Sequence, residues 1–171
     1  MTLRSLFTFP DPVNEKAART VAACVVVMSV TAIAADQPWL LVALAAGFWA
    51  RVLTGPTLSP IGRLATSVVA PALGKPKEVP GPPKRFAQGI GAAFSTAAVA
   101  LWFGADAHTA ALAVTASLAG AALLEAALGL CLGCKIFGLL MRIGLVPQSV
   151  CEACADLSSR HPELSREPAR P

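Results

Sequence analysis

The sequence has few charged residues for its length. Asp, Glu, Lys and Arg make up only 14% of its 171 residues, whereas soluble domains contain about a quarter. Hydrophobic residues make up 55% of the chain, and the mean hydropathy is +0.63. Internal repeats and low-complexity tracts are absent from the sequence. This composition excludes an ordinary soluble domain and predicts an all-α integral membrane protein.

Four apolar windows are long enough to approach or cross a hydrocarbon core, which needs about 20 helical residues. They cover residues 17–35, 38–53, 86–104 and 109–130. Only short connections join the first window to the second and the third to the fourth. The sequence therefore predicts a four-transmembrane-helix bundle of two hairpins. Small residues should let these helices pack closely: Gly89, Ala93, Gly120 and Gly129.

All 14 Lys and Arg residues lie outside the two hairpin turns, which contain Asp36 and Asp106 as their only charged residues. Because cytoplasmic loops carry the excess of positive charge, both termini should be cytoplasmic. The net charge of +4 then reflects orientation in a membrane, so we expect the lipid bilayer as partner and no nucleic acid.

The N-terminal segment allows an alternative interpretation as a signal peptide, because Ala-Ile-Ala at 32–34 resembles a cleavage site. Asp11 and Glu15 in the preceding region argue against it. Asp11 can instead cap a helix that has Pro12 at its first position. We therefore expect the segment to be part of the membrane domain, which we assign to residues 1–158.

The loop between the two hairpins has two parts. Residues 59–74 offer a Ser cap, an early Pro and apolar residues near helical spacing, which predict a short helix in the inner interface. Residues 75–85 are rich in Pro and cations, so we expect an extended, solvated linker near anionic lipid heads.

Two charged residues, Arg51 and Glu125, fall inside the apolar windows. An isolated charge there costs a few kcal/mol, so each needs a partner. We interpret them as an ion pair that orients the helices. A proton or ligand site next to the cysteines is the alternative.

Four cysteines follow the last window as two Cys-x-x-Cys pairs, separated by sixteen residues: Cys131, Cys134, Cys151 and Cys154. This spacing is typical of tetrathiolate zinc sites and also of paired redox thiols. A short helix should follow the first pair, and Ser149 to Glu152 resembles a capping box that opens a second one. Residues 131–154 thus form a Cys-rich helical segment, and the polar tail 159–171 should be disordered.

Three stretches resemble one known family: "FPDPVNEKAAR", "GPPKRFAQGIG" and "EAALGLCLGCKIFGLLMRIGLVPQSVCEACAD". The chain is similar to the bacterial membrane family called domain of unknown function 4395. The resemblance implies a small multi-pass protein of the bacterial plasma membrane without an established activity. It also implies thioredoxin-like or rhodanese-like proteins as neighbours. The matching positions include Asn14, Glu15, Arg19, Lys84, Arg85, Glu125 and the four paired cysteines.

The sequence leaves two functional hypotheses and a neutral one. In the first, the cysteine pairs act as a cytoplasmic thiol-disulfide or sulfur relay with a thioredoxin-like or rhodanese-like partner. In the second, the four thiols bind a structural zinc ion that forms a docking surface for a cytosolic partner. The cysteines can also be inert. We favour the relay, because Cys151 at a helix start and the Gly-flanked first pair suit reactivity.

Overall fold

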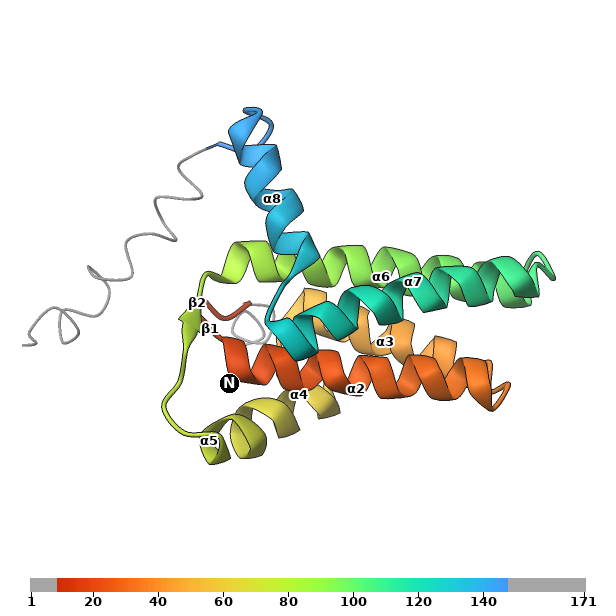
Figure 1. The fold of residues 1–171 in the computed structure, drawn as a ribbon, viewed down its shortest axis with the longest axis horizontal. Coiled ribbons are helices and arrows are strands. Elements are labelled where there is room, and N and C mark those ends of the chain that lie inside the picture. Colours follow the sequence, from red (N-terminus) through yellow and green to blue (C-terminus); the bar gives the residue numbers. More distant parts are fainter. Residues whose placement is uncertain (1–8, 148–171) are drawn as a thin grey trace, which may run out of the picture.

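The protein is a bundle of long helices with two shorter helical segments beside it (Figure 1). The structure is a computed structural model and describes residues 9–147. The long helices are α2 (Glu15–Ala34), α3 (Trp39–Thr54), α6 (Gly81–Phe103) and α7 (His108–Leu128). The shorter elements are β1 (Val13–Asn14), α4 (Pro60–Leu64), η1 (Ala65–Val69), α5 (Ala70–Ala72), β2 (Glu78–Val79) and α8 (Leu132–Arg142).

The long helices match the four predicted windows to within a few residues at most boundaries. Among the described residues, α2, α6 and α7 are long and apolar enough to cross a membrane, and α3 is apolar but has only 16 residues. Both hairpin turns, residues 35–38 and 104–107, lie at one end of the bundle, which we call the hairpin end. At the opposite end α2 and α6 begin and α3 and α7 end. We call it the basic end.

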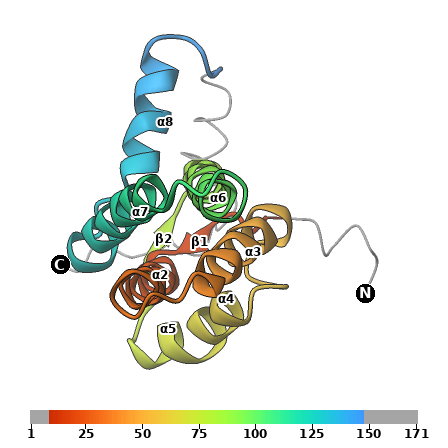
Figure 2. The same cartoon turned by 90° about the vertical axis from the view of Figure 1, so that its right-hand side faces the viewer.

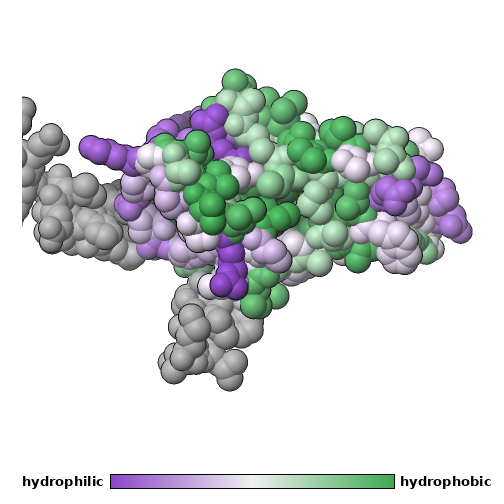
Figure 3. All heavy atoms as spheres, turned by 90° about the horizontal axis from the view of Figure 1, so that it is seen from below, coloured by the Kyte–Doolittle hydropathy of each residue, from purple (hydrophilic) through white to green (hydrophobic). Residues whose placement is uncertain are grey.

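Seen end-on, the helices follow the order α2, α3, α6, α7 around the bundle (Figure 2). Thus α2 packs mainly on α7, and α3 mainly on α6, whereas α3 and α7 lie diagonally opposite. Every long helix contributes to the central core, which consists of Val25, Leu44, Phe48, Ala92 and Leu118. On the face shown in Figure 3, hydrophobic residues cover much of the middle, and hydrophilic residues gather toward the two ends.

Close packing of α3 on α6 depends on a glycine that was not predicted, whereas the predicted Gly129 does lie close to Glu15 of α2. A Cβ atom at Gly89 or Gly120 would meet nothing within 4 Å, so these two glycines are not needed for contact. At Gly91 on α6 a Cβ would lie 2.2 Å from Cε1 of Phe48 on α3. The difference arises because the Phe48 ring, rather than a second small residue, fills the space between the helices.

The predicted inner helix is present as α4, η1 and α5, one helical stretch with a π-helical turn in its middle. It begins at the Ser59 cap, whose side chain accepts a hydrogen bond from the Gly62 N–H. Its buried side packs on α2 through Ala65 and Ala70. Its other side exposes large apolar residues: Leu64, Val68 and Leu73.

The Pro-rich segment after this helix is more ordered than the predicted linker. Val79 in β2 pairs with Val13 in β1, and α6 already begins at Gly81. The Gly81 N–H donates to Oδ1 of Asp11 at 3.0 Å. The prediction that Asp11 caps the first helix is therefore wrong: Asn14 caps α2, and Asp11 caps α6 from a distant part of the chain.

After α7 the chain turns sharply into α8, which points away from the bundle on the side opposite α4 and α5 (Figures 1 and 2). The prediction of a short helix next to the first cysteine pair is confirmed, although α8 starts earlier than expected, at Leu132, and so includes Cys134. Phe137 packs on Phe86 of α6, with ring centroids 5.5 Å apart. The capping box at Ser149, the second cysteine pair and the predicted disordered tail lie outside the described residues.

Candidate functional site

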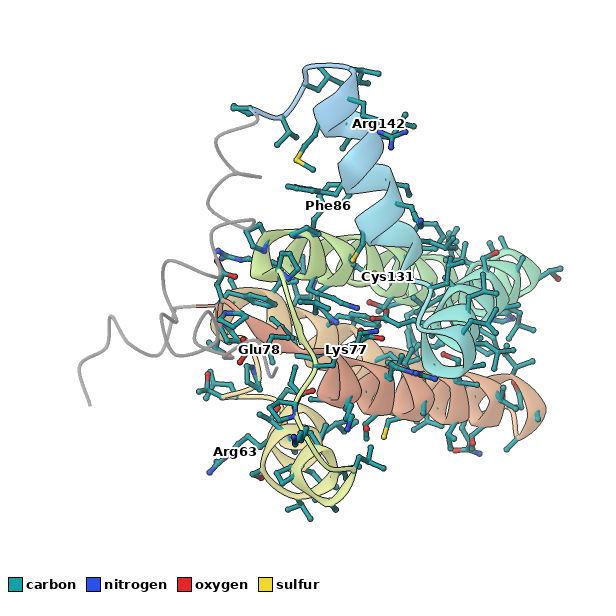
Figure 4. The ribbon with its side chains drawn as sticks, turned by 60° about the vertical axis from the view of Figure 1, so that its left-hand side comes forward. Arg63, Lys77, Glu78, Phe86, Cys131 and Arg142 are labelled. Carbon is teal, nitrogen blue, oxygen red and sulfur yellow. The ribbon has the colours of Figure 1, made fainter. Side chains whose placement is uncertain are left out.

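The first cysteine pair lies at the junction between α7 and α8. Gly129 adopts the left-handed conformation that ends α7 (φ 68°), and Cys131 is the N-cap residue of α8. Cys131 is buried and Cys134 is half-buried. Between them, a Cβ atom at Gly133 would lie 2.5 Å from Cβ of Ala87. A glycine at this position thus lets the first turn of α8 lie directly on α6, with Cys131 at its base (Figure 4).

The two thiols of this pair interact with each other. A hydrogen bond from the Cys134 side chain to Cys131 lowers the pKa of Cys131, and the nearby Lys84 ammonium acts in the same direction. Burial and the Glu125 carboxylate oppose this shift. The same hydrogen bond and burial raise the pKa of Cys134. Cys131 is therefore the thiol that ionises first, and its position at a helix N-terminus also favours a thiolate.

A buried ion pair stands beside the thiols. Nζ of Lys84 on α6 lies 2.5 Å from Oε1 of Glu125 on α7, and the two side chains are only 8% and 16% exposed. Both charges act on the pKa of Cys131 and of Cys134. Glu125 thus lies near the first cysteine pair, with Lys84 as its ion-pair partner.

The predicted ion pair between Arg51 and Glu125 is corrected by this arrangement. Arg51 is on α3 and Glu125 on α7, and these helices lie diagonally across the bundle. Helix α6 packs against both, so its side chains reach each charge first. Lys84 forms an ion pair with Glu125, while Gln88 accepts a hydrogen bond from Nε of Arg51 at 2.9 Å.

Sequence reasoning missed Lys84 because it placed this residue in a solvated linker. The signal that could have found it is the Gly-Pro-Pro at residues 81–83, since Pro is favoured in the first turn of a helix. A helix that starts there carries Lys84 and Gln88 on one face, four residues apart.

Arg51 itself is held by neutral groups. Its side chain is 5% exposed, its Nη1 donates to Oγ of Ser59 at 3.3 Å, and its guanidinium lies 4.6 Å from the centroid of the Phe48 ring. Such a stack on an aromatic face is favourable for a cation. It supplies no compensating negative charge.

Other cations at the basic end bind the carbonyl groups that helices leave unpaired at their C-termini. Arg19 donates to the carbonyl oxygens of Ala126 and Ala127 in the last turn of α7. Arg85 donates to the carbonyl oxygen of Val52 in the last turn of α3. These cations also match the negative end of each helix dipole. These hydrogen bonds stabilise the basic end and do not involve the thiols.

A cavity of about 320 Å³ runs between α2, α6, α7 and α8 and reaches the site. Its walls are mostly apolar and include Phe48, Phe94 and Leu118. Gln88, Glu125 and Cys131 also line it. Cys131 therefore faces the interior of the bundle, whereas Cys134 is the more exposed thiol.

The structure does not test the predicted four-thiol set, because Cys151 and Cys154 lie outside the described residues. Between residues 9 and 147, no group of three or more His, Cys, Asp or Glu side chains could hold a metal ion. The remaining described cysteine, Cys24, is half-buried on α2.

Comparison with known proteins identifies one family. A family model described as Domain of unknown function (DUF4395) matches residues 13–142. The matched region contains the first cysteine pair and the Lys84–Glu125 ion pair. Comparisons with curated proteins and with solved structures found no match.

Proposed function

The chain belongs to the DUF4395 family, a domain of unknown function, and from this premise and the geometry of its first cysteine pair we propose that it is a membrane-bound thiol relay. One observation carries the proposal: two hydrogen-bonded thiols lie at a helix N-terminus beside a buried Lys84–Glu125 pair. A Cys-x-x-Cys pair in such a setting has one thiol of lowered pKa, which is the property of an attacking thiol.

The proposal includes a topology of four spans in the bacterial plasma membrane with both termini in the cytoplasm. It is supported by the common position of both hairpin turns at one end and by the cations at the other. The 16 residues of α3 suit a span where the bilayer thins locally or where flanking residues reach the interface. In this orientation, Cys131 and Cys134 lie at the cytoplasmic boundary of the membrane.

The relay proceeds in two exchange steps. The Cys131 thiolate attacks one sulfur of a disulfide on a thioredoxin-like protein, so that a mixed disulfide forms and the other partner sulfur leaves as a thiolate. Cys134 then gives up its proton and attacks the Cys131 sulfur. The products are a Cys131–Cys134 disulfide and a partner dithiol, which has gained two electrons and two protons.

The same thiolate can accept the terminal sulfur of a persulfide on a rhodanese-like protein, with the partner thiolate as leaving group. Lys84 favours the thiolate in either reaction by its positive charge. In this proposal Cys151 and Cys154 form the second pair, which resolves the disulfide or stores the sulfur that the first pair has received. The alternative role for all four thiols is a structural zinc site that docks a cytosolic partner.

A trapping experiment tests the relay. In a full-length Cys151→Ser/Cys154→Ser chain, Cys134→Ala removes the resolving thiol. Incubation of this reduced chain with an oxidised thioredoxin-like protein should give a reductant-sensitive 1:1 adduct through Cys131, detected by mass spectrometry. The matched control, Cys24→Ala in place of Cys134→Ala, should give no lasting adduct, because Cys134 resolves it.

Two results would overturn the relay. One is a Cys134→Ala chain that forms no adduct although Cys131 is reduced and the chain is folded. The other is a wild-type protein that retains about one zinc ion per chain after purification and whose four paired thiols resist alkylation until a chelator is added. That second result would establish the zinc scaffold in its place.

A further inference from the structure

A second cavity, of about 250 Å³, opens at the basic end and adjoins the thiol cavity, with which it shares Ala18, Val21 and Gln88. It lies between the N-terminal segment before α2, the end of α3, the start of α4 and the start of α6. The apolar part of its wall consists mainly of proline, alanine and valine residues. Its polar side chains are Asn14, Arg51, Thr66, Glu78, Lys84 and Gln88.

One of these side chains, Arg51, is a buried cation that has no anionic partner among residues 9–147. The ion pairs within residues 9–147 are Lys77–Glu15 and Lys84–Glu125, so neither involves Arg51. Its hydrogen bonds go to the neutral groups of Gln88 and Ser59. A charge taken out of water is costly unless an opposite charge compensates it.

The two amide side chains in the wall already use their oxygen atoms as acceptors. Oε1 of Gln88 accepts the Arg51 hydrogen bond, and Oδ1 of Asn14 accepts from the backbone N–H of Lys16 at 3.0 Å. Each amide therefore has its NH2 group left to donate. The guanidinium of Arg51 has five N–H groups, of which Nε and one on Nη1 are used in these bonds.

The net charge of the wall points in the same direction. Lys84 is neutralised by Glu125, which lies on the far side of it in the thiol cavity. Glu78 is exposed in β2 and can turn toward water. What remains is one buried positive charge surrounded by N–H donors and apolar carbon.

We propose that this cavity binds one oxyanion, a carboxylate or phosphate, carried either by a small organic molecule or by the head group of an anionic lipid. The anion sits on Arg51 and accepts hydrogen bonds from Gln88 and Asn14, while the proline and valine wall contacts the apolar part of the ligand. The proposal does not rest on the thiol relay, because neither cysteine lines this cavity.

Thermal unfolding in neutral detergent at constant ionic strength tests the proposal, with sodium chloride as reference. The probes are inorganic phosphate, benzoate and phosphatidylglycerol. At least one probe should raise the Tm of the wild-type protein by several degrees, with saturation. The shift should vanish in Arg51→Gln and persist in Arg63→Gln, which removes an exposed cation of α4 outside the cavity.

The pattern across the probes identifies the source of the anion. A shift with phosphate or benzoate indicates a free anion, whereas a shift with phosphatidylglycerol alone indicates a lipid head group. Because Arg51→Gln can fail to fold, calorimetric titration of the wild-type protein with the same probes is a second measurement and should give about one site per chain. If no probe binds, or if Arg63→Gln loses the shift as fully as Arg51→Gln, the cavity is not an oxyanion site.

Discussion

At the scale of single residues, the thiol site depends on how Glu125 is neutralised. Its partner Lys84 comes from the first turn of α6, and both are largely shielded from water. Both charges act on the pKa of the nearby Cys131, in opposite directions. Loss of either partner leaves an uncompensated charge in the bundle, whereas loss of both removes the charge and its cost together.

This gives a prediction for stability. Glu125→Gln should destabilise the protein by about 3–5 kcal/mol, because it leaves the Lys84 ammonium buried without its carboxylate. The double change Lys84→Met/Glu125→Gln should recover part of this loss. Reversible unfolding in mixed detergent micelles measures both.

A matched control is available on the surface of the same end. The pair Lys77–Glu15 has a Lys side chain that is 70% exposed, so Lys77→Met should cost no more than about 1 kcal/mol. Additive losses for Lys84→Met and Glu125→Gln would contradict the pairing as a source of stability.

At the scale of elements, α8 is held to the bundle by a narrow contact. Gly133 lies against Ala87, and Phe137 packs on Phe86, while another side of the helix is exposed. That side carries large apolar residues at helical spacing: Leu132, Ile136, Leu139 and Ile143. An exposed apolar row on a helix that leaves the bundle sideways suits the interface of a membrane. The exposed row on α4, η1 and α5 suits the same environment on the other side.

The narrow contact makes α8 sensitive to one methyl group. Gly133→Ala should place its Cβ 2.6 Å from Cα of Ala87, which is closer than van der Waals contact allows. The clash should destabilise the fold by about 1–3 kcal/mol. It should also move Cys131 away from the Lys84–Glu125 pair, whose carboxylate opposes the thiolate more than its ammonium favours it, and so speed the alkylation of Cys131 at neutral pH. Unfolding in detergent and the rate of alkylation measure the two effects.

Gly138→Ala is the matched control for this change. It lies in the same helix, and its Cβ would meet nothing within 4 Å, so it should be neutral or slightly stabilising because Ala favours a helix. Equal losses for Gly133→Ala and Gly138→Ala would mean that helix propensity, rather than the contact with Ala87, governs the site.

At the scale of the whole molecule, the two ends of the bundle differ in charge. Asp36 and Asp106 lie in the two turns of the hairpin end, and both have a positive φ. The opposite end holds the cations and the helix C-termini that several of them cap. This asymmetry supports the proposed orientation, with the thiols and the second cavity both reached from the cytoplasm.

The orientation predicts the outcome of reporter fusions. Fusions at Asp36 and Asp106 should be active only with a reporter that works outside the cytoplasm, whereas fusions at Lys77 and after residue 171 should be active only with a cytoplasmic reporter. A cytoplasmic result at either Asp position would contradict the four-span topology. An external C-terminus would place the paired thiols in an oxidising compartment and remove the basis of the relay.

The sequence by itself determined the apolar, all-helical class, the four long helices, the hairpins and the segregation of charge. These properties depend on local hydropathy and on counts of Lys and Arg, which do not require knowledge of helix neighbours. A short helix next to the first cysteine pair also followed from local signals, although the structure includes Cys134 in that helix. Such features are repeated over many residues, so small errors at helix boundaries do not change them.

The tertiary structure alone decided which groups meet. Glu125 pairs with Lys84 because α6, and not α3, lies next to α7. Asp11 caps α6 because the β1–β2 pair brings the two segments together. Arg51 lines a cavity with neutral partners for the same reason of helix order. Each of these contacts depends on the order and rotation of helices far apart in the chain, which no local pattern encodes.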